Sequence, residues 1–151
     1  MSIPSGLAMT TSSADPYDLK RFLSAQKPVI DQVRTELRVG RKSSHWMWFI
    51  FPQIVGLGRS ETARFYAIGS REEAAAYVAH PVLGQRLVEC TRRVNALDGA
   101  SAEQIFGNVD AAKFRSCMTL FAAVASEQTE FSDALRKYFR GTADEATVER
   151  I

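Results

Sequence analysis

The residues best suited to chemistry gather in the stretch 44–53, which holds a histidine, a glutamine and both tryptophans of the chain. His45 could act as a general acid or base, because its unperturbed pKa lies near neutrality. It could equally hydrogen-bond a neighbour at the edge of the core, since the sequence shows no partner for it. Trp46 and Trp48 are two residues apart and cannot share one helix face. We therefore expect one in the core and the other beside a groove, together with the amide of Gln53; the alternative is that both tryptophans are core residues.

A lysine on a later predicted helix is a second candidate. At 100° per residue, Lys113 falls between Cys117 and Leu120, inside the apolar sector of its helix. A lysine there either snorkels to solvent or points into a cavity to meet an anion. Ser116, one turn on, could share such a cavity. Arg59 follows two glycines and is a further candidate for binding an anionic group, or else a plain surface arginine.

Carboxylates support an enzyme only weakly. Asp110 reads as the N-cap of the helix that carries Lys113, although its closeness to Lys113 would let it double as a site residue. The sequence shows no Ser/His/Asp or Cys/His arrangement and no acid pair typical of a hydrolase. The loop 56–60 lacks the phosphate-loop pattern. We expect no metal and no cofactor, and the catalytic residues, if there are any, stay open, with His45 and Asp110 as candidates.

Composition excludes several classes of protein. A chain of 151 residues with 46% hydrophobic and 24% charged residues fits one globular domain. The 19 basic residues nearly balance 17 acidic ones, so we expect no nucleic-acid partner unless basic residues gather on one face. Nucleic-acid binding would require Arg34, Arg38, Arg41, Lys42 and other basic residues to share that face. The basic run 38–42 is instead expected to complement a helix dipole and to cap carbonyls.

The cysteines and the termini suggest a cytoplasmic protein. Cys90 and Cys117 fall on apolar helix faces, where reduced, buried thiols are the expectation. No segment reaches the ~18 apolar residues of a membrane span, and the N-terminus lacks the pattern of a signal peptide. We therefore expect a cytoplasmic protein without a membrane partner.

The elements that must position these side chains are helical. Residues 1–14 carry no hydrophobic period and are predicted to be a flexible arm. Residues 15–151 are predicted to form a single compact all-α domain of eight to ten mostly short helices around the segment 44–53. That segment is expected to be a short buried helix, because the rest of the chain offers no convincing strand to pair with it.

Helix starts and stops can be located from capping residues. The predicted starts are Asp15 before Pro16, Ser43 or Ser44, Ser60, Ser70 with Glu73, Ser101 with Gln104, Asp110, and Thr142 with Glu145. The predicted ends are Pro28, Gly40, Pro52, Gly69, His80-Pro81, Asp98-Gly99, Gly107 and Gly141.

A series of motifs from Asp15 to Ile151 resembles a known family. The motifs are Asp15-Pro16-Tyr17-Asp18-Leu19, Ser44-His45-Trp46-Met47-Trp48-Phe49, Phe51-Pro52-Gln53, Gly56-Leu57-Gly58-Arg59-Ser60, His80-Pro81-Val82-Leu83-Gly84, Ile105-Phe106-Gly107 and Lys113-Phe114-Arg115-Ser116-Cys117-Met118-Thr119-Leu120-Phe121. The family is a widespread bacterial one of small all-α proteins of unknown function.

The resemblance implies an all-α domain and brings no activity or catalytic residues. Members are sometimes labelled "calpastatin", but calpain inhibitors of that name are disordered chains, whereas this chain has the aromatic content of a globular core. The family pattern has a serine where this chain has Cys117, which argues against a thiol nucleophile there. The aromatic helix and the pair Lys113-Phe114 also resemble the superfamily of small helical proteins that process ADP-ribose-type nucleotides.

Two hypotheses for function follow. In the first, the protein binds or converts a small anionic metabolite of nucleotide or ADP-ribose type, in a pocket between the segment 44–60 and the helix 110–121. Trp46 or Trp48 would stack on a ring, Arg59 and Lys113 would hold phosphates, and Gln53 and Ser116 would add polar contacts. In the second, the protein is a non-enzymatic interaction module with a protein partner that the sequence does not identify. A closed pocket favours the first and a flat apolar patch favours the second.

Overall fold

The computed structural model describes residues 15–151, and within these the chain forms ten helices and no strand. The helices are α2 (Lys20–Gln26), α3 (Ile30–Val39), α4 (Met47–Ile50), α5 (Glu61–Phe65), α6 (Arg71–Ala79), α7 (Leu83–Asn95), α8 (Ala102–Phe106), α9 (Asn108–Val124), α10 (Thr129–Phe139) and α11 (Glu145–Val148). The prediction of an all-α domain of mostly short helices is confirmed. The predicted arm 1–14 lies outside the described residues.

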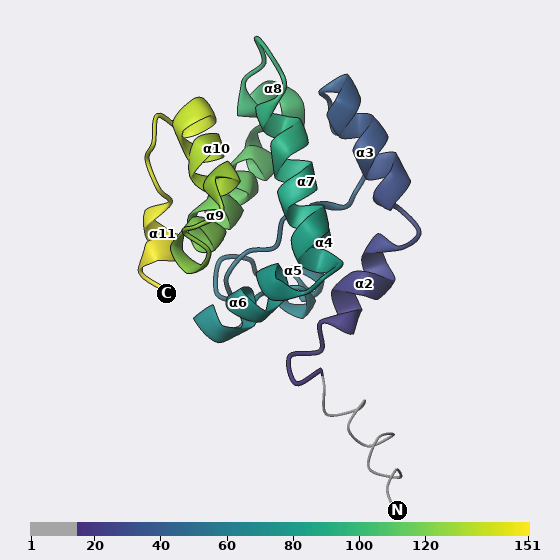
Figure 1. The fold of residues 1–151 in the computed structure, drawn as a ribbon, viewed down its shortest axis with the longest axis vertical. Coiled ribbons are helices and arrows are strands. Elements are labelled where there is room, and N and C mark those ends of the chain that lie inside the picture. The colour runs from purple at the N-terminus through teal and green to yellow at the C-terminus, as the bar shows by residue number, and fades with distance from the viewer. Residues whose placement is uncertain (1–14) are drawn as a thin grey trace, which may run out of the picture.

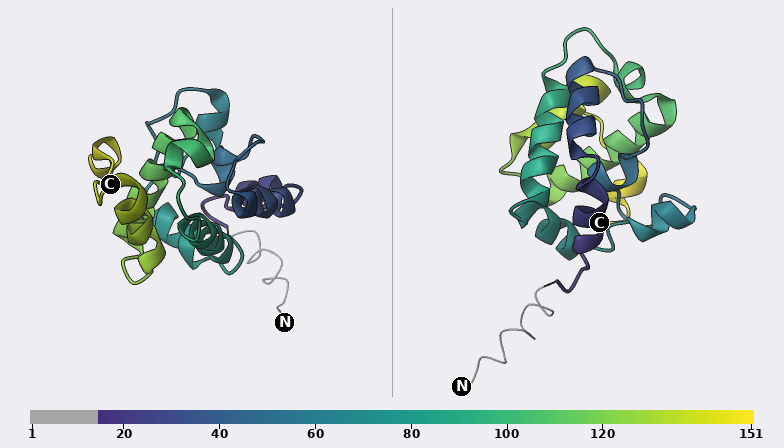
Figure 2. Two further views of the ribbon diagram at one scale, coloured as in Figure 1. Left: turned by 90° about the horizontal axis from the view of Figure 1, so that it is seen from above. Right: turned by 90° about the vertical axis from the view of Figure 1, so that its right-hand side faces the viewer.

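Helix α9 is the centre of the packing. It contacts α6, α8, α10 and α11, and its buried residues, which include Phe114 and Phe121, cover most of its circumference. Helix α7 packs against α3, α6 and α10, with its apolar stripe inward and its arginines off that stripe. Figure 1 shows α7 between α3 on one side and the pair α9 and α10 on the other, and Figure 2 gives the same arrangement from two further sides.

The aromatic segment lies in the core, as predicted. The ring of Phe51 packs edge-on against Phe114 at a centroid distance of 5.0 Å and against Phe106 at 6.0 Å. Trp46 adds a tilted contact with Phe51 at 6.2 Å. Such pairs stabilise a core beyond their buried area, so these rings tie the one-turn helix α4 to α8 and α9.

The first helix begins later than predicted. Asp15 does accept hydrogen bonds from the backbone N–H groups of Leu19 and Lys20. However, Asp18 adopts φ 52°, in the left-handed region that interrupts a right-handed helix. Residues 16–18 therefore form a turn beneath the Asp15 carboxylate, and α2 starts at Lys20.

Three other predicted caps are wrong. Gly107, with φ 84°, both ends α8 and starts α9, so Asp110 lies in the first turn of α9 instead of capping it. Asp144, not Thr142, caps α11. Ser44 donates its hydroxyl to Glu36 instead of capping α4. The caps at Ser60 and Ser70, the capping box of Ser101 with Gln104 and the left-handed end at Gly40 are confirmed.

Residues after α5 leave the helix for an extended contact. Helix α5 ends at Phe65, four residues before the end predicted at Gly69. Ile68 instead forms an isolated parallel bridge with Ile54, in which its N–H donates to the carbonyl of Gln53 at 2.8 Å. This bridge holds the strand-like segment after Pro52 against the chain that follows α5. None of the helices in residues 15–151 is both long and apolar enough to cross a membrane.

Candidate functional site

An open groove lies beside Trp48, between the loop 56–60, the first half of α9 and the start of α11. Its volume is about 580 Å³, within the range of small-molecule sites. Its walls combine five of the predicted ligand-binding side chains with apolar neighbours. Lining residues are Trp48, Gln53, Leu57, Gly58, Arg59, Ser60, Ala63, Val109, Ala112, Lys113, Ser116, Asp144 and Ala146.

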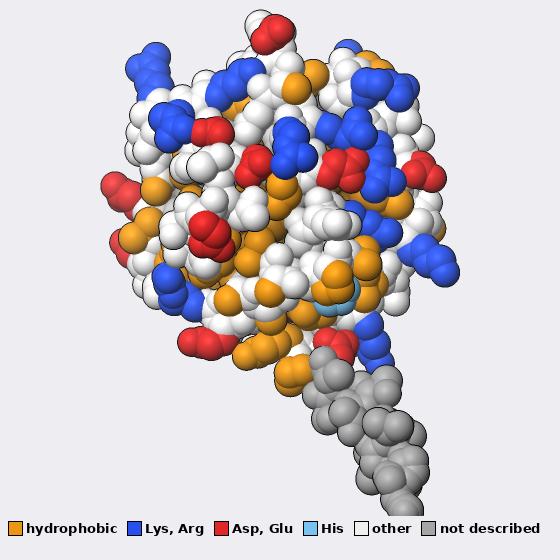
Figure 3. Space-filling model, viewed as in Figure 1, with side chains coloured by type: hydrophobic (Ala, Val, Ile, Leu, Met, Phe, Trp, Pro, Cys, Tyr) orange, Lys and Arg blue, Asp and Glu red, His pale blue; other side chains and the backbone are white. Residues whose placement is uncertain are grey.

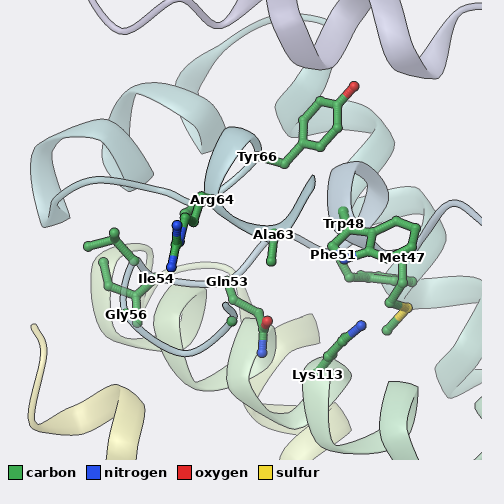
Figure 4. Close-up of a pocket in the computed structure, with 13 residues that line it drawn as sticks. Met47, Trp48, Phe51, Gln53, Ile54, Gly56, Ala63, Arg64, Tyr66 and Lys113 are labelled. Atoms are coloured by element: carbon green, nitrogen blue, oxygen red, sulfur yellow. The ribbon is translucent and has the colours of Figure 1, made fainter. Parts of the chain in front are cut away.

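A much smaller cavity adjoins the groove. It measures about 20 Å³, which is room for a single water molecule, and it shares Trp48, Gln53 and Lys113 with the groove. Figure 4 shows Lys113 rising from α9 toward Trp48, with Gln53 beside it and the hydroxyl of Tyr66 directed away. The lysine therefore faces both the enclosed cavity and the open groove.

Lys113 is held by an aromatic face and a distant carboxylate. Its ammonium lies 4.9 Å from the centre of the Trp48 ring, a distance that gives a cation–π attraction. Its nearest carboxylate oxygen, Oδ1 of Asp110, is 3.6 Å away, longer than a hydrogen bond. With 24% of its side chain exposed, Lys113 neither snorkels freely nor has a close anionic partner.

Asp110 makes its short contact with another lysine. Nζ of Lys42 lies 2.8 Å from Oδ2 of Asp110, and only 9% of the Lys42 side chain is exposed. Lys42 also lies over the ring of Trp46, at 5.2 Å from its centre. Of the predicted roles of the basic run, Arg38 does lie in the last turn of α3, where it complements the helix dipole, but among residues 15–151 no side chain of the run caps a carbonyl of α3, and Lys42 reaches across to α9 instead. Asp110 is shared by two lysines, so this cluster carries one positive charge in excess.

Trp46 is a core residue fixed by a buried carboxylate. Its indole N–H donates to Glu36, which also accepts from the N–H groups of Ser43 and Ser44 and from the amide of Gln32. Burial would raise the pKa of Glu36, but these bonds, with that from the Ser44 hydroxyl, outweigh burial and lower the pKa to about 2. The carboxylate is thus ionised without a cationic partner in the described part of the chain, and it holds the chain at the start of the aromatic segment.

Ser116 is closed off by α11. It is buried, and its hydroxyl lies 3.1 Å from the carbonyl of Ala112 and 3.2 Å from Oδ2 of Asp144. The same Asp144 oxygen accepts from the backbone N–H and the hydroxyl of Thr147. Ser116 therefore contributes to the wall of the groove more than to its reactive surface.

His45 and Arg59 are both exposed, but only Arg59 lines the groove. His45 lines neither the groove nor the small cavity, so the structure does not bring it together with Lys113. Within residues 15–151, the Arg59 side chain has no hydrogen bond or ion pair, which leaves its guanidinium available at the groove's edge. The loop before it depends on small residues, since a Cβ at Gly58 would lie 2.5 Å from the Cβ of Ala63.

The arrangement is suited to binding more clearly than to covalent chemistry. Burial raises the pKa of Cys90 to about 12 and that of Cys117 well above its usual value of 9.0, so neither thiol is a nucleophile near neutral pH. No group of three or more His, Cys, Asp or Glu residues in the chain from 15 onward could hold a metal ion. What the groove offers is an indole, an amide and two cations.

Sequence reasoning found the polar side of the groove and missed most of its apolar wall. Leu57, Val109, Ala112 and Ala146 were not predicted, because they sit on ordinary surface positions of their elements. Asp144 could have been recognised as a cap, since it directly precedes the last helix. Lys42 gave no local signal of its ion pair with Asp110.

The fold defines a small all-α protein with a single compact domain. The chain belongs to the family DUF1810, described as a protein of unknown function, whose pattern matches residues 16–151. It is similar to the conserved hypothetical protein Rv1873 from Mycobacterium tuberculosis, whose crystal structure gives a TM-score of 0.88 at 52% sequence identity over 89% of this chain and 96% of that one. The comparison with curated proteins gave no match. The family resemblance is thus confirmed, and it carries no activity.

Proposed function

We propose that the groove binds a small anionic metabolite that carries a ring, of nucleotide or ADP-ribose type. The observation that carries this proposal is the position of Lys113. Its ammonium faces the groove, lies against an aromatic ring and is 3.6 Å from a carboxylate that already has a closer lysine at 2.8 Å. An incoming phosphate oxygen would give Lys113 the short charge-assisted bond that it lacks.

The neighbouring side chains fit the remaining parts of such a ligand. Arg59 offers a free guanidinium at the edge of the groove, and a guanidinium binds phosphate in a two-point fork. Trp48 is half-buried and presents indole surface to the groove, where a base or sugar ring could pack. Gln53 supplies a donor and an acceptor that no described side chain satisfies.

A thermal-shift screen of the pure protein tests the proposal. The probes are AMP, ADP-ribose, NAD and ribose 5-phosphate, each over a range of concentrations. A ligand at 100 times its Kd adds about 2.7 kcal/mol of stability, which raises the melting temperature of a domain of this size by roughly 5–10 °C. A shift with at least one of these probes is expected, and an unchanged melting temperature with all of them would contradict the proposal.

Variants then place the ligand. Lys113→Ala should weaken binding by about 10- to 100-fold, the usual effect of losing a hydrogen bond to a charged group. Trp48→Ala should weaken it by a comparable factor. Lys27→Ala, which removes an exposed lysine outside the groove, is the matched control and should bind as the wild type does. Equal binding by Lys113→Ala and the control would exclude Lys113 from the site.

One observation favours the second hypothesis, a non-enzymatic module that binds a protein partner. Val109, on the groove wall, is 71% exposed, and an exposed apolar side chain beside a groove is also typical of a protein contact. A protein partner would be expected to bury Val109, so Val109→Ser should weaken its binding. Because serine adds no charge beside Lys113, the same variant should leave the binding of a small anion largely unchanged, which separates the two functions.

A further inference from the structure

Five arginines line the seam between α3 and α7, far more than the near-neutral charge of the chain would suggest. Arg34 and Arg38 are one turn apart on α3, and Arg86, Glu89 and Arg93 follow one another at one-turn intervals along α7. Arg41 follows the end of α3. Figure 3 shows the basic side chains gathered over α3 and the adjoining part of α7.

The carboxylates at this seam do not neutralise it. Glu89 accepts from Arg34 through Nε at 2.8 Å and Nη2 at 3.0 Å, and from Arg93 through Nε at 2.9 Å. Asp31 lies 3.2 Å from Arg34, whereas Glu36 is buried on the opposite flank against Trp46. Among residues 15–151, Glu89 and Asp31 are the carboxylates that form ion pairs with these five arginines, and Arg86 donates to the amide oxygen of Gln26.

Two of the arginines are free. Arg38 and Arg41 are exposed, and within the described part of the chain neither side chain makes a hydrogen bond or an ion pair. Their side chains cap none of the carbonyls of α3 in the described part of the chain; the carbonyl of Glu36 accepts instead from the backbone N–H groups of Gly40 and Arg41. Arg34 and Arg93, by contrast, are held in place by Glu89, so the seam combines fixed and available guanidinium groups.

We propose that the α3–α7 seam binds the phosphodiester backbone of a nucleic acid. Guanidinium groups match phosphate oxygens in geometry and in charge. No aromatic side chain is exposed along the seam, so bases are not read by stacking and the contact is with the backbone. Neither the groove nor the small cavity lies on this face, which disfavours an acidic peptide anchored by its side chains. From the sequence, nucleic-acid binding is expected only if Arg34, Arg38, Arg41 and Lys42 gather on one face. The three arginines do so at the seam, whereas Lys42 is turned inward to Asp110.

The test is fluorescence anisotropy of a labelled short DNA duplex, titrated with the full chain at several salt concentrations. Four or five phosphate contacts predict that log Kobs falls against log salt with a slope of about −4. Non-specific binding of this kind has a Kd of about 10⁻⁴–10⁻⁶ M at physiological salt. Absence of binding at low salt would overturn the proposal.

A matched pair of variants separates a local site from overall charge. Arg38→Glu/Arg41→Glu changes two free, exposed arginines, so folding should be unaffected; it should reduce the affinity by at least tenfold and bring the slope to about −2. Lys20→Glu/Arg71→Glu makes the same change in net charge at two exposed basic residues, the first residues of α2 and α6, which lie outside the groove, and should bind the duplex like the wild type. Equal losses in both variants would overturn the proposal, because overall charge would then explain the binding.

A competition experiment addresses the other class of polyanion. Polyglutamate at the same charge concentration should displace the duplex less than unlabelled duplex does. If it displaces the duplex equally well, the seam recognises carboxylate chains and the nucleic-acid proposal is overturned. The proposal is independent of the groove, because its variants leave Lys113 and Trp48 in place.

Discussion

The indole N–H of Trp46 donates a hydrogen bond of 2.9 Å to Oε1 of Glu36, a carboxylate that is 3% exposed and forms no ion pair within residues 15–151. Five donors from α3 and the chain 43–46 converge on this one group. A buried acceptor with this many partners is expensive to remove, because each donor would be left unpaired. The conformation at the start of the aromatic segment, residues 44–46, therefore depends on Glu36, eight to ten positions earlier.

Glu36→Gln should destabilise the protein by about 3 kcal/mol near neutral pH, because the pKa of Glu36 falls from its usual 4.5 to about 2 on folding and each pKa unit is worth about 1.4 kcal/mol. A depressed pKa contributes stability that is present above 4.5 and is lost as the pH falls toward 2. Urea unfolding of both proteins between pH 7 and pH 2.5 measures this. A difference between them that stays constant with pH would contradict the assignment.

Asp110→Asn should cost about 2–3 kcal/mol, since it leaves the largely buried ammonium of Lys42 without a partner. Lys42→Met in the same chain should recover part of that loss, as chemical denaturation of the single and double variants would show. If Lys113 holds a phosphate, Asp110→Asn should also bind the anionic probes more tightly, since a competing carboxylate is gone. Unchanged stability would mean that the short Lys42–Asp110 contact contributes little.

Gly84→Ala should destabilise the protein by about 3 kcal/mol, although alanine favours helices. A Cβ at Gly84 would overlap the backbone carbonyl of Val78, so α6 and α7 would have to separate. Gln85→Ala, on the exposed side of the same helix, is the control and should change stability by less than about 0.5 kcal/mol. Thermal unfolding of the two variants measures the contrast. Similar melting temperatures would show that the two helices can move apart cheaply.

Cys90 and Cys117 should not react with a thiol reagent such as Ellman's reagent in native buffer at pH 8. Both are buried, and burial raises their pKa values, so little thiolate is present and little is accessible. In guanidinium both should react at once, and the released chromophore counts them. Rapid labelling of one thiol in the native protein would instead reveal local opening of α7 or α9.

Local rules predicted most of the fold, and long-range polar contacts were the main omission. Ser60, Gly40 and the pair Ser101 with Gln104 are local signals, and the structure confirms them. The start of α9 was misplaced because Gly107 serves two helices at once, which no single-helix rule anticipates. Glu36 lies three residues after Val33 on the buried face of α3, and a carboxylate at an apolar position was the available sign of a buried network.

In the candidate groove, too, local patterns predicted some features and long-range contacts determined the others. Helical periodicity placed Lys113 on the inward side of its helix, and the structure places it with Trp48, Gln53 and Arg59 around one groove. Periodicity could not tell which tryptophan is buried, because that depends on the hydrogen bond from Trp46 to Glu36. Nor could it show that His45 points to solvent, since a one-turn helix gives no repeat from which to read a face.

The two tryptophans make the protein its own optical reporter. Trp46 is sealed in the core beneath Lys42, and Trp48 borders the groove beneath Lys113. Emission from Trp46 should stay constant until the domain unfolds, whereas emission from Trp48 should change as soon as an anion draws the ammonium away from its ring. Trp46→Phe and Trp48→Phe would divide the spectrum into these two components, so that occupancy and unfolding can be followed in one unlabelled sample.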